Sequence, residues 1–116
     1  MKNEKIPTYN QHQQYYSMIK KIVKNEYYSV VDSGLFEINY FDNLIDIDED
    51  AQHAVDYLSK IKNCDWDTAR NLVVGDCVWK MDDIAYNDII QSDLPPANRE
   101  KIKLIEEHLK EEDYDM

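Results

Sequence analysis

The fold class of this chain depends on residues 27–47, which read YYSVVDSGLFEINYFDNLIDI. Tyrosine, valine, phenylalanine and isoleucine dominate this stretch, and these residue types are enriched in β-strands. From Phe36 to Tyr40 apolar and polar residues alternate, which is the pattern of a half-buried strand. Turn residues stand before this segment at Gly34 and after it at residues 42–43. We therefore predict a small antiparallel sheet of two or three strands, with a helix through Gly34 as the competing interpretation.

The residues on either side of this stretch follow helical spacing instead. Thr8 and Gln11 have the spacing of a capping box, and the apolar residues after them predict a helix over residues 9–24. The clearest helical pattern covers residues 48–62, with Asp48 as its N-cap, acidic residues in its first turn and lysines in its last turn. Two helices therefore flank the predicted sheet.

Three further helices are expected in the second half of the chain. The first begins after Asp65 and ends at Gly75, because glycine is the usual residue just beyond a helix C-terminus. The second starts at residue 82 or 83 and ends at Ile90. The third follows Pro95-Pro96, since proline is tolerated in the first turn of a helix but not in its interior.

Together these patterns predict a single α+β domain over residues 1–116, mostly helical, with about five helices and a small antiparallel β-hairpin or three-stranded sheet. A chain of 116 residues has the size of one domain and can bury a core without disulfides or metal. Residues 1–7 and 111–116 are expected to be flexible. The chain has no apolar run long enough to span a bilayer and no secretory signal, so we expect a cytoplasmic protein.

Charge is divided unevenly along the chain. Residues 1–31 carry five lysines against two glutamates, whereas the remaining residues carry eight basic and twenty-two acidic side chains, for a net charge of −11. A surface this negative repels nucleic acid and anionic membranes and attracts basic surfaces. For this reason we do not assign Lys20, Lys21 and Lys24 to phosphate binding, which needs a dominant positive field.

No motif for catalysis or metal binding accompanies this charge. The two glycines are too few for a phosphate-binding loop or a dinucleotide-binding loop. Acidic residues and one histidine within residues 46–57 are better explained by helix capping and surface pairs than by a metal site. We expect two reduced thiols, Cys64 and Cys77, and neither cofactor, metal nor enzymatic activity. A pocket joining His53 to several carboxylates would favour an enzyme instead.

Tyrosine is unusually frequent, with nine residues, and two pairs are adjacent at 15–16 and 27–28. Neighbouring residues on one helix or strand cannot both face the core, so one member of each pair should be exposed. Exposed tyrosine is typical of protein interfaces because it offers a large area and a hydroxyl at little cost in rotamer entropy. The alternative is that the tyrosines merely border a small core.

These features predict a non-enzymatic inhibitor that occupies a basic, nucleic-acid-binding surface of a partner protein, with carboxylates in the place of phosphates. In size, acidity and lack of a catalytic motif the chain is similar to small acidic phage proteins that block host restriction or CRISPR nucleases. We expect no direct binding of nucleic acid or membrane. The alternative is a structural or adaptor protein, including a homodimer, that binds through tyrosine and aliphatic residues. The residues expected to bind the partner are Asp46, Asp48, Glu49, Asp50, Glu106, Glu107, Glu111, Glu112, Tyr15 and Tyr28.

Overall fold

The computed structural model describes residues 5–87 and 93–114, with side chains as far as Glu111, and 84% of these residues are helical. The helices are α1 (Tyr9–Ser33), α2 (Glu37–Ile47), α3 (Glu49–Lys62), α4 (Trp66–Asn87) and α5 (Arg99–Tyr114). No strand occurs among the described residues, so the prediction of an α+β fold with a β-hairpin or three-stranded sheet is wrong.

The stretch at residues 27–47 is helical because the apolar residues that share a face are spaced by three and four, not by two. Phe36 and Ile38, which suggested a strand, are 81% and 61% exposed. The buried residues of α2 are Tyr40, Phe41, Asn43, Leu44 and Ile45. Gly34 ends α1 in the left-handed region, at φ 69°, and its amide donates to the carbonyl of Val31. The predicted turn at Gly34 therefore separates two helices.

Helix α4 also differs from its prediction, because one helix of 22 residues replaces two short ones. Gly75 lies inside α4 and does not end it. The buried side chains continue past this position at helical spacing, from Val73 to Cys77, Met81 and Ile84, so tertiary packing overrides the low helix propensity of glycine. The last residues of the helix predicted to reach Ile90 lie outside the described residues.

The structure confirms two of the predicted helix N-caps. The capping box of Thr8 with Gln11 is confirmed, although α1 continues to Ser33 and not to residue 24. Asp48 is confirmed as the N-cap of α3, since its side chain accepts from the amide of Ala51. Helix α5 continues through Tyr114, so residues 111–114 are helical in backbone. The flexibility expected for residues 1–4 and 115–116 lies outside the described residues.

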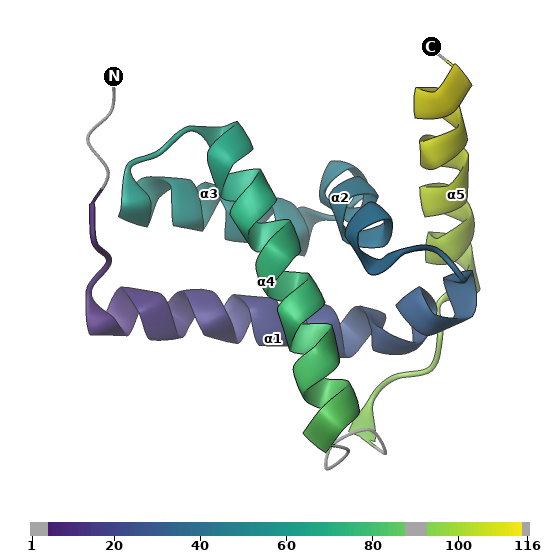
Figure 1. Ribbon diagram of the computed structural model, residues 1–116, viewed down its shortest axis with the longest axis horizontal. Coiled ribbons are helices and arrows are strands. Elements are labelled where there is room, and N and C mark those ends of the chain that lie inside the picture. Colours follow the sequence, from purple (N-terminus) through teal and green to yellow (C-terminus); the bar gives the residue numbers. More distant parts are fainter. Residues whose placement is uncertain (1–4, 88–92, 115–116) are drawn as a thin grey trace.

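The five helices form a flat assembly of 42 × 39 × 20 Å. Helix α4 crosses α1 and α3 on one broad face, whereas α2 and α5 lie together at one end (Figure 1). Side chains from α1 to α5 meet in one core, whose largest fully buried members include Tyr15, Tyr40 and Phe41. Among the described residues, no helix combines the length and the apolar character needed to cross a membrane.

Candidate functional site

Folding brings the two predicted acidic segments to one place, where α2, α3 and α5 meet. His108 Nε2 on α5 lies 2.8 Å from Asp46 Oδ2 on α2, and Lys101 Nζ on α5 lies 3.0 Å from Asp48 Oδ1 at the start of α3. We use the name acidic junction for the acidic residues of the two segments that these contacts join, namely Asp46, Asp48, Glu49, Asp50, Glu106, Glu107 and Glu111. The sequence separates the two segments by more than fifty residues, so only the fold makes them neighbours.

Asp46 is exposed, but its carboxylate is engaged by other side chains of the protein. Arg70 on α4 donates to both of its carboxylate oxygens, at 2.7 and 3.1 Å, and also to the side chain and carbonyl of Asp42. The hydrogen bonds from Arg70 lower the pKa of Asp46, although partial burial opposes them, and His108 acts in the same direction as Arg70. Arg70 thereby fixes α4 to α2, and Asp46 is largely neutralised by this contact.

Asp48 is likewise engaged by groups of the protein itself. Besides capping α3, it accepts from Lys101, which at the same time binds Glu26 Oε2 on α1 at 3.1 Å. Glu26 is only 5% exposed, and Tyr40 donates to its second oxygen at 2.9 Å. Burial opposes the charge on Lys101, but its hydrogen bond with Asp48 and the charge of Glu26 raise the pKa above its ordinary value. One lysine therefore joins α1, α3 and α5.

The remaining carboxylates of the junction face solvent. No ion pair among the described residues engages the exposed side chains of Glu49, Asp50, Glu106, Glu107 and Glu111. The side chain of Glu112 lies outside the described part of the chain. Helix α5 also exposes Lys103 and Lys110, so its outer surface is mixed and not uniformly acidic.

The two tyrosines expected at the interface have different environments. Tyr15 is 2% exposed, and its hydroxyl donates to Asp76 on α4, so burial and this carboxylate both raise its pKa. Its ring therefore offers no surface to a partner, and the exposed member of the pair is Tyr16. Tyr28 is half-buried, with its ring centroid 5.3 Å from that of Tyr27.

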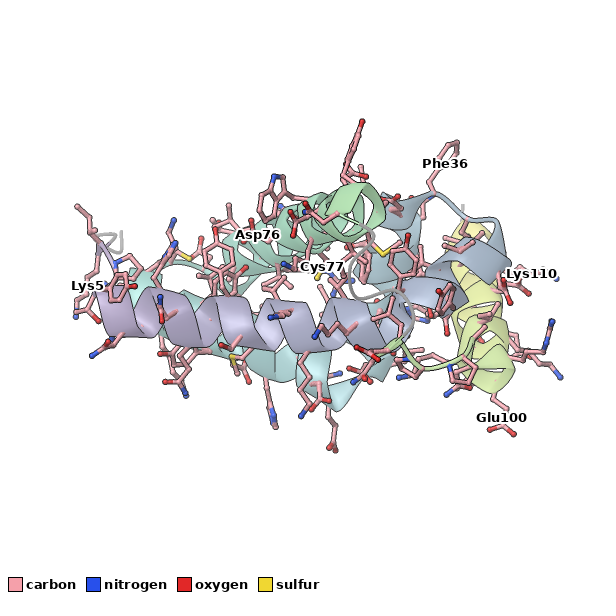
Figure 2. The ribbon with its side chains drawn as sticks, turned by 90° about the horizontal axis from the view of Figure 1, so that it is seen from below. Lys5, Phe36, Asp76, Cys77, Glu100 and Lys110 are labelled. Carbon is pink, nitrogen blue, oxygen red and sulfur yellow. The ribbon has the colours of Figure 1, made fainter. Side chains whose placement is uncertain are left out.

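In the part of the chain that the structure describes, the cysteines are buried and the histidines are not grouped with several carboxylates. Cys77 lies between α4 and α1 (Figure 2), and burial, with a smaller effect from the charge of Asp76, raises the pKa of its thiol. Cys64 is a buried free thiol as well. The hollow beside His53 measures about 100 Å³ and contains one carboxylate, that of Asp50. Within residues 5–87 and 93–111, no three histidine, cysteine or acidic side chains are grouped as metal ligands.

Sequence reasoning missed an exposed apolar surface on α4. We call it the α4 ridge; it is formed by Leu72, Gly75, Trp79 and Tyr86. Trp79 is 60% exposed and Tyr86 is 89% exposed. The three large side chains are seven residues apart, which places them along one side of a helix. The spacing of these three residues is visible in the sequence, but the prediction that a helix ends at Gly75 placed them on two different helices.

A hollow lies on each side of this ridge. Between α4 and α1, Trp79 and Lys80 face Tyr16 and Lys20 across a hollow of about 400 Å³. On the other side, Gly75 borders a hollow of about 350 Å³ with Ile38 of α2. The ridge therefore stands between two depressions of a size that could receive side chains of another molecule.

Comparison with models of protein families, with curated proteins and with solved structures finds no match to this chain. The geometry of the acidic junction and of the α4 ridge is therefore the basis for assigning a function.

Proposed function

We propose that this chain is a non-enzymatic binding protein that occupies a basic, nucleic-acid-binding surface of a partner protein in the cytoplasm. It would act as an inhibitor of the anti-restriction or anti-CRISPR kind, with exposed carboxylates taking the positions of phosphates. It would need no cofactor and would bind neither nucleic acid nor membrane itself.

The observation that carries this proposal is the distribution of partners at the acidic junction. The basic side chains Arg70, Lys101 and His108 all contact carboxylates of the chain itself, whereas Lys103 and Lys110 lie exposed on α5. The exposed carboxylates of the junction outnumber these two lysines, and the whole chain has a net charge of −11. Such an excess destabilises a compact protein through self-repulsion, and a basic partner would relieve it.

The test compares the wild-type chain with a junction variant carrying Glu49→Lys, Glu106→Lys, Glu107→Lys and Glu111→Lys. These four side chains are exposed and form no ion pair within the described residues, so the variant should keep its fold, as circular dichroism can verify. Both proteins are used as tagged bait in native cytosol at low and high salt. We expect the wild type alone to capture a basic protein, and high salt to release it.

A charge-matched control carries Asp32→Lys, Asp67→Lys, Asp93→Lys and Glu100→Lys, which changes the net charge equally at exposed positions outside the junction and the α4 ridge. This control should still capture the partner. The captured protein is then purified with its nucleic acid, and wild-type chain should displace that nucleic acid in a fluorescence-anisotropy assay. Equal capture by wild type and junction variant, or failure to displace the nucleic acid, would contradict the proposal.

The adaptor interpretation is a second candidate because the α4 ridge exposes large apolar side chains. Binding through such a surface buries apolar area and depends little on salt. Capture that resists high salt, or self-association of the chain as its only interaction, would therefore favour the adaptor.

A further inference from the structure

Helix α4 has apolar side chains on two opposite sides. Its inner side supplies buried residues such as Val73, Cys77 and Ile84 to the core. Its outer side carries the α4 ridge on the broad face of the molecule where α4 lies over α1 and α3 (Figure 1). A surface helix needs only one apolar side to hold its place, so the apolar area that stays exposed on the outer side is not required for packing.

Gly75 gives independent evidence that the outer side receives something. A Cβ atom at this position would meet no atom within 4 Å, so no contact inside the protein requires glycine there. Inside a helix, glycine costs about 1 kcal/mol relative to alanine. What the missing side chain does permit is close approach of another backbone, as at points where two helices cross.

The shape around Gly75 fits a crossing helix. The hollow toward α1 and the hollow toward α2 lie on opposite sides of the ridge, and Gly75 itself borders the second. A helix laid across α4 at its lowest point would direct side chains at i and i+3 or i+4 into the two hollows. Trp79 and Ile38 would then contact the apolar side of that helix.

The edges of the ridge carry more acidic than basic side chains, the basic ones being Lys20 and Lys80 toward α1. Asp76 lies toward α1, where Tyr15 donates to it. Asp82 lies toward α2, close enough to Glu37 for its charge to add to burial in raising the pKa of Glu37. Asp83 is neutralised by Lys80 at 2.9 Å. A second copy of this chain would bring two such edges of net negative charge together, whereas a partner with basic edges would complement them.

We propose that the α4 ridge is the docking surface for an amphipathic α-helix of a partner protein. That helix carries aliphatic residues along one side and lysine or arginine along its edges, and it crosses α4 at Gly75. The surface is distinct from the acidic junction, so this inference does not depend on the function proposed above.

The probe is a pair of synthetic helical peptides as long as α4. Both have the same leucine side, and one has lysine edges whereas the other has glutamate edges. Binding is followed by the emission of Trp79 in the full chain carrying Trp66→Phe, which leaves a single tryptophan. We expect the lysine peptide to shift the emission to shorter wavelength and to bind about tenfold more tightly than the glutamate peptide.

Two variants test the crossing point. Gly75→Leu fills the site of closest approach and should weaken the lysine peptide about tenfold or more. Ala85→Leu adds the same side chain at another exposed position of α4 and should leave binding unchanged. Gly75→Ala is the smallest change at this position and replaces the leucine variant if that variant does not fold. It should weaken binding of the lysine peptide and raise the melting temperature of the protein.

Three results would overturn the inference. The first is equal binding of the two peptides, and the second is wild-type binding by both Gly75 variants. The third is a wild-type dimer in sedimentation that Gly75→Leu converts to a monomer, because a second copy would then be the occupant. The junction variant must bind the lysine peptide as the wild type does, so failure of the function proposed above leaves this test intact.

Discussion

Helices α3 and α4 pack against each other but are built differently. In α3, Ala51, Ala54, Val55, Leu58 and Ile61 face the core, and Glu49, His53, Asp56 and Lys60 face solvent. In α4, apolar residues occupy the inner side and much of the outer side. Helix α3 is therefore explained by the fold alone, whereas α4 exposes apolar surface that no part of the described fold covers. Apolar surface beyond the needs of the core indicates an interface.

The largest expected effect comes from leucine removal on the two helices. Leu58→Ala on α3 empties a buried site and should lower the free energy of unfolding by about 3 kcal/mol. Leu72→Ala on α4 removes a partly exposed side chain and should cost less than about 1 kcal/mol. Urea denaturation measures both changes in unfolding free energy. Similar values for the two variants would contradict the proposed difference between the helices.

The next effect concerns Arg70, a charged contact on the inner side of α4. Arg70→Met leaves Asp42 and Asp46 without their cation and should cost about 2 kcal/mol near neutral pH, since the arginine is largely buried but the carboxylates are partly solvated. The pKa of Asp46 is lowered from 3.8, so its stabilisation is complete above that pH and is lost as the pH falls through the lowered value. The difference in unfolding free energy between wild type and variant should therefore become smaller in acid. A difference that does not depend on pH would show that the loss comes mainly from packing of the arginine's aliphatic part.

Replacement of Gly75 by alanine should act in the opposite direction. The position is helical and open, so the variant should gain about 1 kcal/mol in unfolding free energy. A calorimetric melt measures this gain. A loss of stability would mean that contacts inside the protein require glycine at this position. Gly75 would then no longer distinguish α4 from α3.

The smallest effect is expected for Trp79, the largest side chain of the ridge. Trp79→Ala should change the free energy of unfolding by no more than about 0.5 kcal/mol, because the ring is mostly exposed. Chemical denaturation followed by circular dichroism can test this without relying on tryptophan emission. A cost comparable with that of Leu58→Ala would assign Trp79 to the core and not to an interface.

These contrasts also explain how much of the fold was predictable. The bounds of α3 were predicted within one residue because capping and a single apolar side point to the same answer. Segment 27–47 was misread because the alternation from Phe36 to Tyr40 imitates a strand, and segment 66–87 because Gly75 was expected to end a helix. Gly34 does end a helix, whereas Gly75 does not. Only the surrounding packing separates the two cases.

The candidate site was predictable in composition but not in pairing. An excess of carboxylates at residues 46–50 is visible in the sequence. That Asp46 and Asp48 are held by Arg70 and Lys101 depends on contacts between distant segments. Sequence alone likewise cannot decide which member of an adjacent tyrosine pair is buried, as Tyr15 shows.

The way in which Lys101 attaches α5 to the other helices has a consequence for local opening of this helix. Helix α5 contributes Ile102 and Ile105 as its only buried apolar side chains up to Glu111, and Lys101 and His108 join it to the other helices. We therefore expect its amides to exchange with deuterium through a local opening that requires less free energy than opening of α1 or α3. Each opening would release the carboxylates of Glu26, Asp46 and Asp48 from their α5 partners. The negative charge available at this end of the molecule would then vary with time, in proportion to the fraction of molecules in which α5 is detached.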